Sequence, residues 1–185
     1  NFYIKKENND NFISIKIDSK TMKVAHPTPY REIYVYDTEM EGCHLRFGPV
    51  SRGGLRWSSR PFDYRKEVLG LVNTQQTKNV VIVPEGSKGC FITKNKTDDF
   101  AKNGMRQYQK FIMGLLDITD SLDVKSNIIH PESVIRYDQA DPYLVVAADK
   151  GTAQFSDIAN DISDNYKFWL GDGFASGGSN GYNHK

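Results

Sequence analysis

The sequence contains only two cysteines, Cys43 and Cys90, among its 185 residues. Its first residues, Asn1-Phe-Tyr-Ile-Lys-Lys, include no apolar stretch of the kind found in a secretory signal peptide. We therefore predict a cytoplasmic protein with reduced thiols, rather than a secreted protein built on disulfide bonds. A disulfide bond between the two cysteines is the alternative.

Long apolar runs and an excess of one charge are also missing. No apolar run approaches the ~20 residues that cross a bilayer as a helix. The 24 basic residues nearly balance the 23 acidic ones, which leaves a formal net charge of +1. A nearly neutral chain has no general attraction to nucleic acid or to anionic lipid. We therefore predict no nucleic-acid partner and no membrane partner.

Familiar metal and nucleotide motifs are absent. The four histidines are not spaced as metal ligands, and neither His-Glu-x-x-His nor Cys-x-x-Cys occurs. The segment around Lys88 lacks the spacing of a P-loop, and the glycine-rich run 173–181 does not match the dinucleotide fingerprint. We therefore expect no metal, and we assign no residue of this chain to a cofactor.

Hydrophobic periodicity predicts strands that alternate with helices. Residues 12–17 alternate apolar and polar side chains, which is typical of a half-buried strand. The apolar runs 80–83 and 143–148 predict strands that are buried on both faces. Further strands are expected at 31–36 and 43–47, and helices are expected to begin at Ser58 or Ser59, at Thr97 and at Ser156, the last running to about Leu170.

This alternation predicts an α/β fold whose mixed, partly parallel sheet is flanked by helices. We divide the chain into a strand-containing lead segment at 1–28, one domain at 29–170 and a glycine-rich connection at 171–185. The first residue is not Met and the last stretch is rich in glycine, so we expect a piece of a longer polypeptide. Ligands of such sheets gather beyond the carboxyl ends of the strands, where we expect Lys88 and Asp149.

Three motifs place cationic or amide groups beside expected glycine turns or on a helix face. Arg52 precedes two glycines and can grip a carboxylate through two parallel N–H bonds. Gln75 and Lys78 share a helix face and can hold a second carboxylate, although their local pattern taken alone favours a solvated helix end. Nearby Arg56 is expected in an ion pair or at the surface. The motifs are Arg52-Gly-Gly-Leu-Arg-Trp57, Gln75-Gln-Thr-Lys78 and Pro84-Glu-Gly-Ser-Lys-Gly89, and they predict a pocket for a small, doubly anionic molecule.

Lys88 and Asp149 are the candidates for acid–base chemistry. Lys88 lies between Gly86 and Gly89, where the backbone can come close to a ligand. A lysine enclosed in a pocket can act as a neutral base because desolvation disfavours the ammonium; an exposed turn lysine is the alternative. Asp149 follows an apolar run and either caps the next turn or faces the ligand. If the two side chains lie close together, they can pass a proton between them.

Several further motifs follow in a fixed order after about residue 29. They are Glu67-Val-Leu-Gly-Leu71, Lys78-Asn-Val-Val-Ile-Val-Pro84, Pro142-Tyr-Leu-Val-Val-Ala-Ala-Asp-Lys-Gly151, Ser156-Asp-Ile-Ala-Asn160 and Trp169-Leu-Gly-Asp-Gly-Phe-Ala-Ser-Gly-Gly178. Together with the three motifs above, they resemble the large, multidomain NAD-specific glutamate dehydrogenases of bacteria. The resemblance implies oxidative deamination of L-glutamate to 2-oxoglutarate and ammonia, with NAD as the cofactor, in a homo-oligomeric enzyme.

The resemblance also implies how the chain is divided. The domain at 29–170 would be the substrate-binding and oligomerisation domain, and a Rossmann domain for NAD would follow Lys185. The chain alone is therefore expected to be inactive. In the family Lys88 matches the lysine that activates water for attack on the imine, and Asp149 matches the aspartate that moves protons at the amino nitrogen. Cys90 stands where the family usually has a second glycine.

The substrate ligands come from the same resemblance. Gln75 and Lys78 match ligands of the α-carboxylate, and Arg52 occupies the position where smaller glutamate dehydrogenases have a lysine for the side-chain carboxylate. Gly54 and Gly86 belong to the same substrate-binding motifs. One alternative is a dehydrogenase of another amino acid. The other is a non-catalytic anion-binding or assembly module with the same fold, and Cys90 is the feature that points to it.

Overall fold

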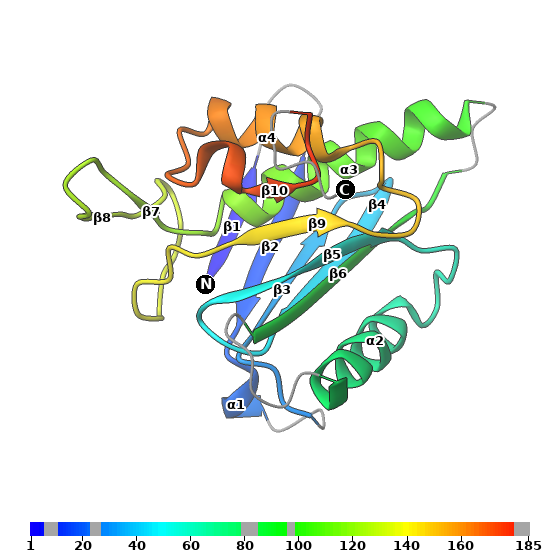
Figure 1. Cartoon of the computed structure of the whole chain (residues 1–185), viewed down its shortest axis with the longest axis horizontal. Helices are drawn as coiled ribbons and strands as arrows, with labels where there is room; N and C mark the ends of the chain where they lie inside the picture. Colours follow the sequence, from blue (N-terminus) through cyan, green and yellow to red (C-terminus); the bar gives the residue numbers. More distant parts are fainter. Residues whose placement is uncertain (6–10, 23–26, 79–84, 96–98, 180–185) are drawn as a thin grey trace.

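The structure, a computed structural model, describes residues 1–5, 11–22, 27–78, 85–95 and 99–179, without the side chains of 75–78. Its main feature is a sheet of eight strands in the order β1-β2-β3-β4-β6-β5-β9-β10 (Figure 1). These strands are β1 (Phe2–Lys5), β2 (Phe12–Ile17), β3 (Arg31–Tyr36), β4 (Met40–Arg46), β5 (Ser51–Trp57), β6 (Glu85–Thr93), β9 (Val145–Ala148) and β10 (Ala175–Ser176).

The sheet joins an antiparallel half to a parallel half. In the order of the sheet, neighbouring strands from β1 to β6 are antiparallel. Strands β6, β5, β9 and β10 run parallel to one another. The predicted mixed, partly parallel sheet is confirmed. Because β5 lies between β6 and β9, a side chain from β6 must cross β5 to meet one that follows β9.

Helices cover both faces of the sheet (Figure 1). Helices α3 (Phe100–Leu116) and α4 (Ser156–Asn165) lie on one face, and α2 (Tyr64–Lys78) lies on the other. The larger hydrophobic core lies between the sheet and the α3–α4 layer, and a smaller core lies under α2. Buried members of the smaller core are Cys43, Leu45, Val68, Val72 and Cys90. The predicted flanking of the sheet by helices is confirmed.

The helices differ from the prediction mainly at their ends. Helix α2 begins six residues after Ser58, because β5 continues to Trp57 and a turn at 61–63 follows. Helix α4 begins at Ser156 as predicted, but it ends well before Leu170 because Lys167 has a positive φ of 51°. A continuous α-helix has no place for a residue in that left-handed conformation.

Helix α3 begins at a side-chain cap. The Asp99 carboxylate accepts a hydrogen bond of 3.0 Å from the backbone N–H of Lys102, which satisfies one of the free donors of the first turn. The predicted first residue, Thr97, lies outside the described residues. The short elements are the helix α1 (Ser19–Met22), the 3-10 turn η1 (Gly171–Gly173) and the hairpin of β7 (Ser121–Leu122) and β8 (Ile128–Ile129).

Two segments predicted as glycine turns are strands, so this part of the prediction was wrong. Arg52 lies in β5, and residues 85–89 form the first half of β6. Here glycine permits close packing of strands: a Cβ added to Gly53 would lie 1.5 Å from the carbonyl oxygen of Ser87. The strand predicted at 80–83 lies outside the described residues.

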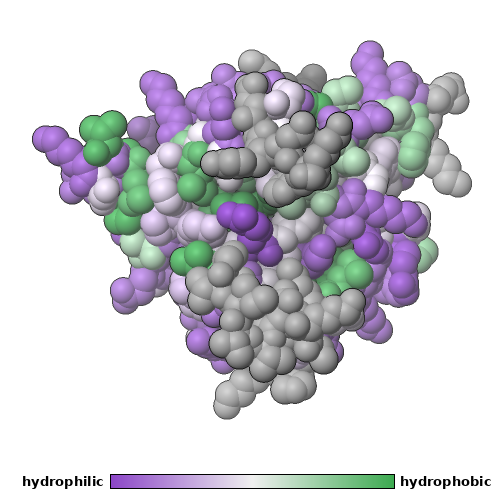
Figure 2. Space-filling model, in the orientation of Figure 1, coloured by the Kyte–Doolittle hydropathy of each residue, from purple (hydrophilic) through white to green (hydrophobic). Residues whose placement is uncertain are grey.

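Several hydrophobic side chains are exposed on the β7–β8 hairpin, which projects from the body of the molecule at the left of Figure 1 and Figure 2. They are Val124, Ile128 and Ile129.

The two cysteines are free and buried. Within the described ranges, every helix is too short or too polar to span a bilayer.

Candidate active site

Lys88 and Asp149 meet on the face of the sheet that α2 covers. The Lys88 Nζ lies 3.0 Å from Oδ2 of Asp149, and the two side chains are 22% and 15% exposed. Asp149 lies just beyond the carboxyl end of β9, as predicted. Lys88 lies inside β6, so its predicted place beyond a strand end was wrong; β6 continues to Thr93. The two side chains nevertheless form one partly buried ion pair.

Gly54 makes this ion pair possible. It lies on β5, the strand between β6 and β9, and its Cα partner on β9 is Ala147. A Cβ added to Gly54 would lie 2.9 Å from the Cβ of Asp149 and 3.2 Å from its Oδ2. Any larger residue would therefore push the carboxylate away from Lys88. Its predicted place at the site is thus explained by the room it leaves for Asp149.

The carboxylate of Asp149 is held in its ionised form. Burial would raise its pKa, but the backbone N–H of Lys150, the Lys88 ammonium and the Arg56 guanidinium outweigh burial and hold the pKa below its ordinary value. The N–H of Lys150 lies 2.7 Å from Oδ1. The backbone N–H of Asp149 donates to Oγ1 of Thr152 at 3.0 Å, which fixes the start of the turn. Asp149 is therefore a proton acceptor at neutral pH.

Arg56 also belongs to this cluster, although the sequence analysis placed it only in an ion pair or at the surface. Its Nη2 lies 3.2 Å from Oδ1 of Asp149, and its Nη1 lies 2.9 Å from Oε1 of Glu67 on α2. The predicted ion pair is confirmed, but its place at the site was missed. A prediction of 51–57 as a strand would have placed Arg56 at the site, because Arg52, Gly54 and Arg56 then point to the same face of the sheet.

Of the predicted substrate ligands that carry long side chains, the structure describes the side chain of Arg52 but not those of Gln75 and Lys78. The Arg52 side chain is exposed on β5 and makes no ion pair with the described residues; its Cα partner on β6 is Gly86. Gln75 and Lys78 belong to the last turn of α2, but their side chains lie outside the described part of the chain. The structure thus brings Lys88, Asp149 and Gly54 together and leaves Arg52, on the same sheet face, as an exposed cation with no ion pair to any described residue.

Cys90, two residues after Lys88, fits its surroundings. It is completely buried in the small core under α2 and is the Cα partner of Cys43 on β4. Its thiol donates to the carbonyl oxygen of Tyr64 at 3.5 Å. The adjacent Cys43 thiol and burial raise the pKa of the Cys90 thiol. The side chain therefore packs against the helix.

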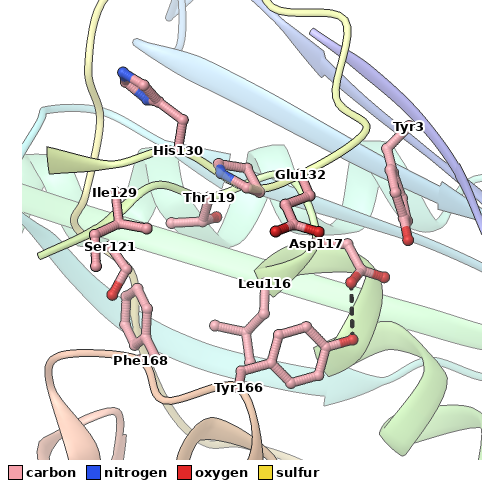
Figure 3. Close-up of a pocket in the computed structure, with 11 residues that line it drawn as sticks. Tyr3, Leu116, Asp117, Thr119, Ser121, Ile129, His130, Glu132, Tyr166 and Phe168 are labelled. Carbon is pink, nitrogen blue, oxygen red and sulfur yellow. Dashed lines mark hydrogen bonds between the residues drawn. The ribbon is translucent and has the colours of Figure 1, made fainter.

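A separate cavity of about 260 Å³ lies beside the β7–β8 hairpin (Figure 3). Its lining includes the carboxylates of Asp117 and Glu132, and the hydroxyl of Tyr166 donates to Oδ1 of Asp117 at 2.8 Å. Among the residues that the structure describes, no lysine or arginine lines this cavity, and neither Lys88 nor Asp149 reaches it. Its charge is therefore unsuitable for a dicarboxylate, unlike the sheet face that carries Arg52 and Lys88.

The family model described as "Bacterial NAD-glutamate dehydrogenase, catalytic domain" matches residues 1–185. Over 193 aligned residues the chain is 52% identical to the NAD-specific glutamate dehydrogenase of Pseudomonas aeruginosa, covering 100% of this chain and 12% of that protein. It is 54% identical to the enzyme of that name from Halomonas elongata, covering 94% of this chain and 11% of that protein.

A third relative is the NAD-specific glutamate dehydrogenase of Mycobacterium tuberculosis. The identity is 52% over 185 residues, which cover 94% of this chain and 11% of that protein. The chain therefore spans only 11% to 12% of the length of these relatives.

Proposed function

The chain belongs to the family of bacterial NAD-glutamate dehydrogenase catalytic domains, and we propose that it forms the substrate half of an active site that deaminates L-glutamate oxidatively to 2-oxoglutarate and ammonia. The observation that carries this proposal is the ion pair of Lys88 and Asp149 at 3.0 Å, which crosses β5 above Gly54. Family membership further supports NAD as the cofactor and a cytoplasmic, homo-oligomeric full-length enzyme.

In this proposal Asp149 and Lys88 divide the proton transfers between them. The ionised Asp149 accepts a proton from the ammonium of the substrate, because its pKa is held low enough for it to remain a base. Lys88 orients the water that attacks the imine carbon and exchanges protons with it. The contact between Lys88 and Asp149 then gives the proton a path from one group to the other.

The carboxylates of the substrate need separate cations. Arg52 is proposed to bind the side-chain carboxylate, because it is exposed on the same sheet face and makes no ion pair with the described residues. Gln75 and Lys78 are proposed to bind the α-carboxylate from the last turn of α2. Two cationic residues, Arg52 and Lys78, would select a dicarboxylic amino acid over an apolar one.

The N-terminus of helix α4 does not suit the pyrophosphate of NAD. Helix α4, which follows the parallel strand β9, has an acidic residue, Asp157, in its first turn. Its Oδ1 already accepts the backbone N–H of Ser179 at 2.6 Å. A negative charge at that position repels phosphate, so the anion site that a helix N-terminus can offer is blocked. NAD, when bound, would supply the hydride acceptor.

The proposed substrate can be tested by its charge. We expect the full-length protein to reduce NAD with L-glutamate in strong preference to L-leucine. Arg52→Ala is expected to raise KM for glutamate by about 10- to 100-fold, because a hydrogen-bonded ion pair to the substrate is lost. The measurement is the initial rate of NADH formation with each amino acid. Arg106→Ala, on the exposed side of α3, serves as the matched control. An Arg52→Ala enzyme with an unchanged preference would contradict the proposed role.

A further inference from the structure

The guanidinium of Arg56 joins two carboxylates that belong to different layers of the molecule. Its Nη1 contacts Oε1 of Glu67 on α2 at 2.9 Å, and its Nη2 contacts Oδ1 of Asp149 after β9 at 3.2 Å. All three side chains are largely buried, with exposures of 21%, 14% and 15%. A cation so enclosed cannot exchange its partners freely with water, so the bridge holds both carboxylates in place.

Arg56 and Lys88 hold different oxygens of Asp149. Lys88 contacts Oδ2 at 3.0 Å, whereas Arg56 contacts Oδ1 together with the backbone N–H of Lys150. The plane of the carboxylate is therefore fixed by donors on both sides. When Lys88 turns toward a substrate or a water molecule, Arg56 and Lys150 still hold Oδ1, and Oδ2 keeps its direction.

Glu67 extends this arrangement to α2. Its second oxygen, Oε2, accepts a hydrogen bond of 2.6 Å from Oγ of Ser58. Burial would raise the pKa of Glu67, but Ser58 and Arg56 lower it below its ordinary value, so Glu67 is an anion and a firm anchor for Arg56. The same helix carries Gln75 and Lys78 in its last turn.

We propose that Arg56, anchored by Glu67, is a positioning residue that fixes the orientation of the Asp149 carboxylate and connects it to α2. The inference rests on the proposed function, because it assumes that Asp149 accepts a proton from the substrate. The guanidinium need not touch the substrate. It acts through Asp149, whose free lone pairs it directs toward the space above Gly54.

The charges around Asp149 predict a pH dependence. Lys88 faces it from β6, Arg56 faces it from β5, and Glu67 of α2 lies behind Arg56. If Arg56 is replaced by a neutral residue, Asp149 loses one cation and gains the uncompensated charge of Glu67. Both changes raise the pKa of Asp149. Because the base must be ionised to accept a proton, the acidic limb of the kcat profile should move to higher pH.

The test uses the full-length enzyme with Arg56→Gln, Arg56→Lys and Arg60→Gln. Arg60 is the matched control because it follows β5 by three residues, has an exposed side chain and pairs with the partly exposed Asp63. We expect Arg56→Gln to lower kcat by on the order of 10²-fold, as displaced catalytic groups do, and to raise the acidic limb by roughly one pH unit. Arg56→Lys should return the acidic limb most of the way to its wild-type pH but should recover less of kcat. An ammonium keeps the charge but cannot contact two carboxylates with the fixed planar geometry of a guanidinium. Arg60→Gln should behave like the wild type.

The outcomes separate this inference from the proposed function. If the wild type oxidises glutamate and Arg56→Gln leaves kcat or the acidic limb unchanged, the positioning role is overturned and the proposed function stands. A loss of kcat without a shift of the limb would mean a merely structural effect and would equally overturn it. If Arg56→Gln fails to fold, the kcat–pH profile of Arg56→Lys tests the positioning role instead. A positioning cation predicts an acidic limb near its wild-type pH together with a reduced kcat. A wild type that does not oxidise glutamate would overturn both proposals.

Discussion

Lys88→Ala in the full-length enzyme is expected to lower kcat/KM for L-glutamate by about 10³-fold or more. In the proposed mechanism this change removes the group that orients the attacking water and that exchanges a proton with Asp149, and acid–base groups typically contribute about 10²- to 10⁴-fold. It also leaves the partly buried Asp149 carboxylate with one fewer cation. The measurement is the rate of NADH formation at saturating NAD over a range of glutamate concentrations.

The control for this experiment is Lys66→Ala. Lys66 is an exposed residue of α2, so its removal should change kcat/KM less than twofold, in keeping with the small effects of surface substitutions. If Lys88→Ala retained a tenth or more of the wild-type value, Lys88 would not be a catalytic residue. The enzyme would then have to obtain its acid–base group elsewhere in the polypeptide.

Gly53→Ala is expected to lower the free energy of unfolding by about 3 kcal/mol or more. The added Cβ would lie 1.5 Å from the carbonyl oxygen of Ser87, and backbone cannot move aside as a flexible side chain can. Such overpacking forces β5 and β6 apart, and clashes of this kind belong to the most damaging substitutions. Because β6 carries Lys88, activity should fall as well. The measurement is urea denaturation followed by circular dichroism.

Gly70→Ala is the matched control for that substitution. Gly70 lies in the middle of α2, and nothing lies within 4 Å of a Cβ built there. Alanine has the higher helix propensity, so this variant should be more stable by about 0.5–1 kcal/mol. Two equal Gly→Ala effects would show that the close approach of β5 and β6 is not what requires glycine at residue 53.

Local patterns predicted the regular parts of the fold well. The strands expected at 12–17 and 31–36 are β2 and β3, residue for residue. In β2 the side chains alternate between buried and more exposed positions, which leaves a period of two in the sequence. The early end of α4 could not be predicted, because Lys167 adopts positive φ without being a glycine. The backbone there follows tertiary packing rather than local preference.

The glycines of the site misled the prediction for a physical reason. Gly53, Gly54 and Gly89 were interpreted as turn residues, yet each lies in a strand where a neighbouring group comes too close for a Cβ. The sequence alone does not distinguish a turn glycine from a packing glycine. For the same reason the role of Arg56 was missed, because its direction follows only once the segment is known to be a strand.

The meeting of Lys88 and Asp149 depends on the order of the sheet. The motifs and the family resemblance named both residues, but their contact requires β5 to lie between β6 and β9 and to carry a glycine at 54. That strand order involves pairings over long stretches of sequence, which local periodicity does not contain. Roles for Arg52, Gln75 and Lys78 stay predictions that await a bound ligand.

The most direct measurement is a crystal structure of the full-length protein soaked with 2-oxoglutarate. The proposed site predicts the keto carbon beside the Lys88 amine and the Asp149 carboxylate, and the distal carboxylate against the Arg52 guanidinium. Density for the ligand somewhere else, such as the cavity beside the β7–β8 hairpin, with this sheet face left vacant, would contradict it.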